Sequence, residues 1–106
     1  MNFNWFHLMP YRFLPEDFPQ KYRSVWVDVP SHLFDPEKGH QLYHEFLDEM
    51  EYAEQVGFDG ICCNEHHNNA YGLMPSPNLI AKLLPSGCQL RQGILGAKQF
   101  LYRVRP

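Results

Sequence analysis

The strongest structural signal in this chain is Gly57-Phe58-Asp59-Gly60-Ile61-Cys62-Cys63-Asn64-Glu65-His66-His67. The pattern predicts a short apolar strand over Phe58–Asn64, followed at once by a carboxylate and two imidazoles. In parallel α/β folds the chemistry gathers at the carboxyl ends of the strands. The stretch therefore indicates an α/β fold and also the edge of the sheet at which a functional site is expected.

The residues before this strand predict a strand, a long loop and a helix. Phe3–Leu8 is rich in aromatic and apolar residues, which favours a first strand. Tyr11–Pro36 combines several prolines with aromatics, so we expect a long loop that packs on the fold. Asp35-Pro36-Glu37 has the acid cap and proline of a helix start. Apolar residues then recur at helical spacing until Gly57, which is expected to stop the helix.

A second helix is predicted to begin at Ser76-Pro77 and to be cut short by Pro85-Ser86-Gly87. The order strand, loop, helix, strand, loop, helix is typical of a parallel α/β sheet. Two such units cannot cover both faces of the sheet, and a complete (β/α)₈ barrel needs roughly 250 residues. We therefore expect an α/β fold made of the opening βα units of an incomplete TIM barrel.

The formal charge divides the chain near Ile80. Residues 1–80 hold 12 acids and 4 basic residues, a net of −8, while residues 81–106 hold 5 basic residues and no acid; the sum is −3. We interpret residues 1–80 as the N-terminal part of the barrel domain and residues 81–106 as a divergent basic tail. Aromatic and basic residues alternate over 98–105, which would suit single-stranded nucleic acid. No companion motif supports that, so an exposed tail without a nucleic-acid partner is preferred.

Cellular location is predicted from what the sequence lacks. No segment has the length and apolarity of a membrane span, and Met1–Phe6 lacks the basic region of a secretory signal. Three cysteines, two of them adjacent, do not form a disulfide framework. The sequence therefore predicts a reduced cytoplasmic protein without a membrane partner.

The candidate catalytic residues are Glu65, His66 and His67. Histidine titrates near neutral pH and is the usual proton-transfer residue, and a neighbouring carboxylate can orient its ring. The simpler interpretation is a solvated turn after a strand, where polar residues are expected in any protein. Residue spacing alone leaves both interpretations open.

Metal binding is a competing interpretation of the same stretch. Cys62, Cys63, His66 and His67 are all zinc-type ligands, but their spacing matches no paired-ligand motif. A strand also points two adjacent thiols to opposite faces. Buried thiols that act as small apolar side chains are preferred, and no metal is expected. A small non-catalytic module that binds a metal or a partner remains the alternative function.

Residues 1–80 resemble the start of the luciferase-like flavin-dependent monooxygenases. The match covers about three quarters of the chain. It rests on Phe6-His7-Leu8-Met9-Pro10-Tyr11, on Lys21–Pro30, on Asp35–His40, on Gly57–Ile61 with Asn64-Glu65-His66-His67, and on Asn69–Asn78. The Glu-His-His strand end followed by Tyr-Gly-Leu-Met-Pro is quite specific to that family.

The resemblance implies a (β/α)₈ barrel that uses reduced flavin mononucleotide and molecular oxygen to oxidise a small molecule. A separate reductase usually supplies the reduced flavin, and related branches use a deazaflavin. His66 matches the histidine that lies beside the flavin and assists proton transfer. Glu65 and His67 belong to the same motif, and His7 and Met9 match the end of the first strand near the face of the flavin ring.

The family pattern stops near Ile80. The family continues there with an alanine-rich helix, a third strand and the later strands that hold the flavin phosphate, and residues 81–106 show none of these. We therefore expect an N-terminal portion of a luciferase-like oxidoreductase that is inactive alone and binds flavin mononucleotide weakly. Apolar faces left uncovered by missing barrel partners lead us to expect association into oligomers.

Overall fold

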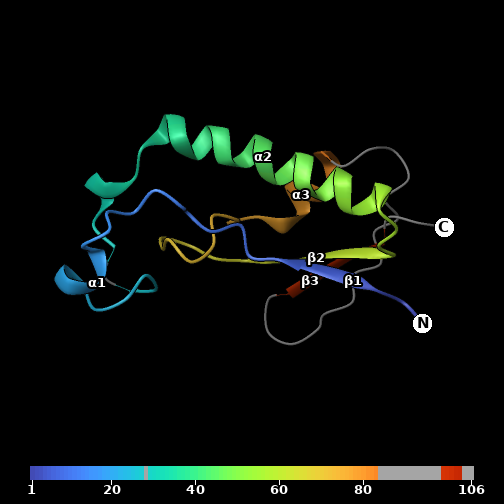
Figure 1. The fold of residues 1–106 in the computed structure, drawn as a ribbon, viewed down its shortest axis with the longest axis horizontal. Helices are drawn as coiled ribbons and strands as arrows, with labels where there is room; N and C mark the ends of the chain where they lie inside the picture. The colour runs from blue at the N-terminus through green and yellow to red at the C-terminus, as the bar shows by residue number, and fades with distance from the viewer. Residues whose placement is uncertain (28, 84–98, 104–106) are drawn as a thin grey trace.

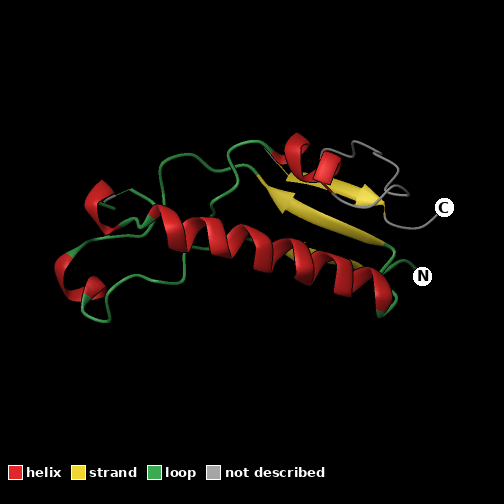
Figure 2. Ribbon diagram, turned by 90° about the horizontal axis from the view of Figure 1, so that it is seen from above, coloured by secondary structure: helices red, strands yellow, loops and turns green. Residues whose placement is uncertain are grey.

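A computed structural model describes residues 1–27, 29–83 and 99–103 of the chain. The elements in chain order are β1 (Asn4–His7), α1 (Phe18–Lys21), the 3₁₀ turn η1 (Ser31–Leu33), α2 (Pro36–Gln55), β2 (Gly60–Asn64), α3 (Pro77–Leu83) and β3 (Gln99–Arg103). The three strands form one sheet in the order β1-β2-β3. The long helix α2 runs beside this sheet (Figures 1 and 2).

Strands β1 and β2 are parallel, with Asn4 opposite Gly60 and His7 opposite Cys63. Two hydrogen bonds between Phe3 and Asp59 fix this register just before the strands begin. The Phe3 N–H donates to Asp59 Oδ2 at 2.8 Å, and the Asp59 N–H donates to the Phe3 carbonyl at 2.8 Å. The predicted strands are confirmed, and α2 is the crossover that a parallel pair requires.

Helix α2 begins and ends at the predicted residues. The Asp35 carboxylate accepts from the backbone N–H groups of Glu37 and Lys38 at 3.0 and 3.3 Å, which caps the helix. At the other end Gly57 has a φ of 106°. The Gly57 N–H donates to the Glu54 carbonyl and the Phe58 N–H to the Ala53 carbonyl, both at 3.1 Å. This pair of bonds is a Schellman motif, which turns the chain from the helix into β2.

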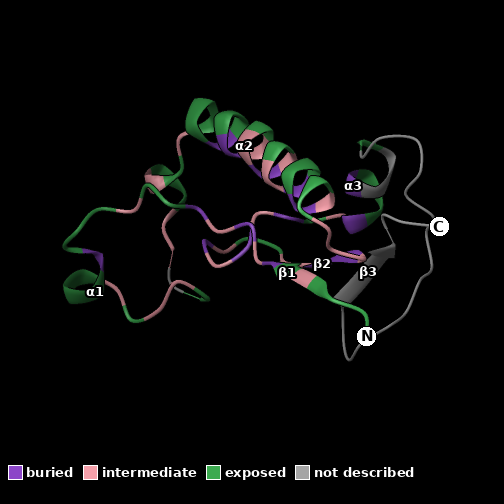
Figure 3. Cartoon of the chain, turned by 45° about the vertical axis from the view of Figure 1, so that its right-hand side comes forward, coloured by how far each residue is buried: buried purple, intermediate pink, exposed green. Residues whose placement is uncertain are grey.

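The core lies between α2 and one face of the β1–β2 pair. Figure 3 shows the buried stripe of α2 facing inward and its exposed side facing away. Leu42, Phe46 and Met50 on that stripe are fully buried and belong to one cluster with Ile61 and Cys63 of β2. Because side chains alternate along a strand, Cys62 and Asn64 project from the opposite face of the sheet.

The long loop after β1 packs on the fold, as its aromatics predict. Tyr11 and Phe18 are buried, and the Tyr11 hydroxyl accepts from the Asp35 N–H at 3.0 Å. The Tyr11 N–H donates to the Ala70 carbonyl at 3.0 Å, which ties this loop to the loop after β2. The loop also contains the two short helical turns α1 and η1, which were not predicted.

Strand β3 lies within the segment that was expected to be a divergent, exposed basic tail, so at least these five residues join the sheet. Gln99–Arg103 pairs antiparallel with β2, from Gly60 opposite Arg103 to Asn64 opposite Gln99. The pairing satisfies the backbone groups on the edge of β2 that β1 leaves open, and Gln-Phe-Leu-Tyr-Arg has aromatic content that suits a strand. A (β/α)₈ barrel has only parallel strands, so β3 is not the third strand of such a barrel.

The incomplete barrel remains a prediction, because a parallel pair with its crossover helix is common to many α/β folds. Helix α3 starts at Pro77, next to the predicted cap at Ser76. The predicted break at Pro85-Ser86-Gly87 lies outside the described residues. Within the described ranges, no helix combines the length and apolarity needed to cross a membrane.

The turn at Gly57 gives a direct test of how α2 is joined to β2. Gly57→Ala should lower the free energy of unfolding by about 1 kcal/mol, because a side chain disfavours a positive φ. The measurement is urea unfolding followed by circular dichroism. Val56→Ala, at the exposed residue just before the turn, serves as the control and should change the stability by no more than about 0.5 kcal/mol. Equal stability of Gly57→Ala and the parent chain would contradict this description of the turn.

Candidate functional site

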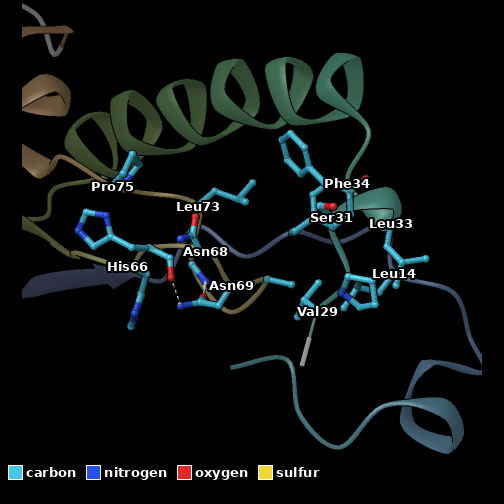
Figure 4. Close-up of a pocket in the computed structure, with 15 residues that line it drawn as sticks. Leu14, Val29, Ser31, Leu33, Phe34, His66, Asn68, Asn69, Leu73 and Pro75 are labelled. Atoms are coloured by element: carbon cyan, nitrogen blue, oxygen red, sulfur yellow. Dashed lines mark hydrogen bonds between the residues drawn. The ribbon is translucent and has the colours of Figure 1, made fainter. Parts of the chain in front are cut away.

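A cavity of about 450 Å³ lies beyond the carboxyl ends of β1 and β2. Figure 4 shows the loop after β2 along one side and the segment between β1 and α2 along the other. The lining residues are Tyr11, Leu14, Val29, Pro30, Ser31, Leu33, Phe34, His66, His67, Asn68, Asn69, Ala70, Gly72, Leu73 and Pro75. The volume lies within the roughly 300–1,000 Å³ of small-molecule pockets. The predicted edge of the sheet therefore carries a pocket, and two of the predicted histidines line it.

His66 is held in place by groups on several sides. Its backbone N–H donates to the Met74 carbonyl at 2.8 Å, which folds the loop back on itself. Its ring meets the rings of Trp26 and Tyr71 edge-on, with centroids 5.0 and 5.5 Å away. Gly72 lies so close that a Cβ there would be 2.4 Å from His66 Cδ2. The small residue therefore leaves the space that the imidazole fills.

Asn64, the last residue of β2, contacts the same imidazole. Its Nδ2 lies 2.6 Å from His66 Nε2, and its side chain is almost fully buried. Asn64 had no predicted role. The signal that could have found it is its place at the strand end, two residues before the histidine.

Glu65 and His67 form a second pair, in which Glu65 Oε1 lies 2.8 Å from His67 Nε2. His67 is more than half exposed, with a relative side-chain exposure of 54%. The two histidines of the motif therefore lie in different surroundings. His66 is enclosed by rings and an amide, whereas His67 is at the surface with its carboxylate.

His7 and Met9 lie away from the cavity lining. His7 faces α2, where its ring packs edge-on against Phe46 with centroids 4.9 Å apart, and its Nε2 lies 2.6 Å from Glu49 Oε2. Its Nδ1 accepts the Met9 N–H at 2.9 Å. Met9 is fully buried. The proposed contact of these two residues with a flavin stays a prediction, and the contacts present are structural.

Met9 nevertheless shapes the site through its backbone. Its φ is 53°, a left-handed conformation that costs roughly 1–2 kcal/mol for a residue with a side chain. The turn lets the Met9 carbonyl accept the Leu73 N–H at 2.8 Å. The Tyr43 hydroxyl donates to the Leu73 carbonyl, and burial raises the pKa of this hydroxyl. Leu73 is thereby held at the cavity wall by the segment after β1 and by α2.

Two loop residues that the sequence analysis gave no role complete the site. Trp26 stacks on Tyr71 with ring centroids 4.1 Å apart. Asn69 Oδ1 accepts the N–H groups of Tyr71 and Gly72, each at 3.1 Å, and so sets the turn that faces His66. The aromatic content of the loop before α2 predicted packing there, but not the partner of each ring.

The cavity fits one part of a flavin better than the other. Aliphatic and aromatic side chains dominate its lining and polar groups gather near His66, which suits a flat ring system with a polar edge. A phosphate is usually held by charge-assisted hydrogen bonds. Among the described residues that line the cavity there is no lysine or arginine. The chemistry of these described residues is compatible with the ring of a flavin, but they offer no cation for its phosphate.

The two cysteines of β2 are not grouped with further metal ligands among the described residues. Both thiols are buried, and burial raises the pKa of the Cys62 thiol. In the described part of the chain, no three His, Cys, Asp or Glu side chains are grouped to hold a metal ion.

Comparisons with protein-family models, curated proteins and solved structures found no match.

The buried His7 predicts a pH dependence of stability. Burial lowers the pKa of His7 below its usual 6.5, against the opposing effect of Glu49, while Arg12 lowers it further. The unfolded chain therefore binds the proton more readily than the folded chain. The stability that neutral His7 contributes is present above about pH 6.5 and is lost as the pH falls below it.

This dependence is measured by urea unfolding between about pH 7.5 and 5.5. The parent chain should lose more stability over this range than His7→Phe, which cannot titrate. Val56→Ala, an exposed residue that carries no titrating group, serves as the control and should keep the slope of the parent. An unchanged slope in His7→Phe would show that His7 does not titrate on unfolding as described.

Proposed function

We propose that residues 1–80 carry the flavin-ring side of a luciferase-like monooxygenase site, in which His66 is the proton-transfer residue. The single observation that carries this proposal is the placement of His66. The histidine that the family motif marks lies at the carboxyl end of a parallel strand, in the lining of a pocket. Chemistry in parallel α/β folds gathers at that edge.

The enclosure of the imidazole also supports proton transfer. The rings of Trp26 and Tyr71 and the bare Cα of Gly72 restrict the motion of the His66 ring. A proton-transfer group works best when it is held within hydrogen-bond reach of its target. The surface pair of Glu65 and His67 is less restricted, so we assign it a supporting role at the rim of the cavity.

The proposed cofactor is reduced flavin mononucleotide, with a deazaflavin as the alternative because the two share a ring shape. When bound, the reduced flavin ring would be the group that reacts with molecular oxygen. Leu73, Val29 and Leu14 would exclude water from one side of the ring. His66 would hold or release a proton at an imidazole nitrogen beside it. A separate reductase and a small-molecule substrate complete the proposed reaction.

Two further features of the proposal concern location and association. The buried Cys62 thiol and the small number of cysteines in the sequence support a reducing compartment, and we propose the cytoplasm. Exposed apolar side chains such as Phe3, Leu79 and Leu83 support association of the chain with another apolar surface.

The test is a chimera in which residues 1–80 replace the corresponding segment of a luciferase-like monooxygenase. The chimera should consume oxygen in the presence of reduced flavin. His66→Ala in this chimera should reduce turnover by roughly 10²- to 10⁴-fold, because general acid–base groups contribute about that much. Oxygen uptake and flavin absorbance report turnover and binding separately.

His44→Ala is the matched control, since His44 lies on the exposed side of α2 and outside the cavity lining. It should keep the turnover of the chimera. A folded chimera that neither binds flavin nor consumes oxygen would refute the family assignment. A fully active His66→Ala chimera would remove His66 from the proposed mechanism.

A further inference from the structure

The amide of Asn64 is buried, and only one of its two polar atoms has a hydrogen-bond partner. The side chain has 6% relative exposure. Its Oδ1 is fully shielded and has no hydrogen-bond partner among the described residues. Leaving such a group without a partner costs about 1–3 kcal/mol. Buried polar groups are normally hydrogen-bonded, so this amide calls for an explanation.

The explanation lies in the other polar atom of the amide, Nδ2, which is 2.6 Å from His66 Nε2. Two orientations of the amide are possible. In one, Nδ2 donates to Nε2 and Oδ1 is left without a partner. In the other, Oδ1 accepts from Nε2–H and the NH₂ group, with two donors, is left buried. Orphaned buried N–H groups are rarer than under-satisfied carbonyls, so the first orientation is favoured.

The orientation of the amide decides where His66 carries its proton. Neutral imidazole has one N–H, and the nitrogen that accepts a hydrogen bond cannot be the one that bears it. If Asn64 donates to Nε2, the proton of neutral His66 is on Nδ1. Trp26 and Tyr71 lie beside the ring, and the space next to Cδ2 is so narrow that Gly72 could not carry a Cβ. These contacts oppose a rotation that would exchange the two nitrogens.

We propose that Asn64 is a positioning residue that selects the Nδ1–H tautomer of His66. Its meaning for catalysis rests on the proposed function, because only then does the location of the proton decide which nitrogen serves the reaction. The tautomer itself depends only on this chain. It can therefore be measured without a flavin, an oxygen assay or a substrate.

The experiment is NMR spectroscopy of the full ¹⁵N-labelled chain, since long-range ¹H–¹⁵N correlations distinguish the two neutral tautomers. The spectra are recorded at about pH 9, where an ordinary histidine is neutral. His66 of the parent chain should give the Nδ1–H pattern. Asn64→Asp should place a proton on Nε2, because a carboxylate only accepts. Asn64→Leu should remove the preference for Nδ1–H.

Cys62→Ala is the matched control, since Cys62 is a buried residue on the same face of the same strand. It should leave the Nδ1–H pattern of His66 unchanged. An Nε2–H pattern in the parent chain would by itself overturn the proposal. This test does not depend on whether any variant folds. An unchanged Nδ1–H pattern in folded Asn64→Asp would overturn it too. A correct tautomer with an inactive chimera would refute the proposed function alone.

Discussion

The parallel pairing of β1 with β2 is the constraint on which the remaining structure depends. The reciprocal bonds between Phe3 and Asp59 set its register. Since side chains alternate along a strand, a slip of one residue would exchange the faces of every side chain. Ile61 and Cys63 would leave the core under α2, and Asn64 would turn toward the helix. The register therefore fixes the core and the contact between Asn64 and His66 together.

Local sequence signals predicted the elements well because each has a local physical cause. Asp35-Pro36-Glu37 satisfies the first backbone donors of α2, and Gly57 adopts the positive φ that ends it. The apolar run over residues 58–64 contains β2. Strand β3 was missed because its formation depends on the open edge of β2, which lies far away in the sequence. The turns α1 and η1 were missed because the prolines in and beside them were interpreted as breaks in regular structure.

The candidate site was predictable in its position but only partly in its composition. A strand that ends in Glu-His-His places polar groups at a sheet edge, and His66 and His67 do line the cavity. His66 is only partly buried, and its contacts with Trp26 and Tyr71 distinguish it from the exposed His67. No local pattern reveals these contacts. His7 was predicted to lie near the flavin ring, but its side chain contacts Phe46 and Glu49 of α2. Only the packing of α2 on β1 determines that outcome.

The claim that a flavin ring fits the cavity beside His66 is tested most directly by titrating the ¹⁵N-labelled chain with lumiflavin. Lumiflavin carries the ring without the phosphate, for which the described lining offers no lysine or arginine. Saturable chemical-shift changes should concentrate at His66, Asn69, Gly72 and Leu73, with Tyr52 and Val56 at the far end of α2 unaffected. Changes confined to other residues, or no saturable change at the solubility limit of lumiflavin, would contradict the claim.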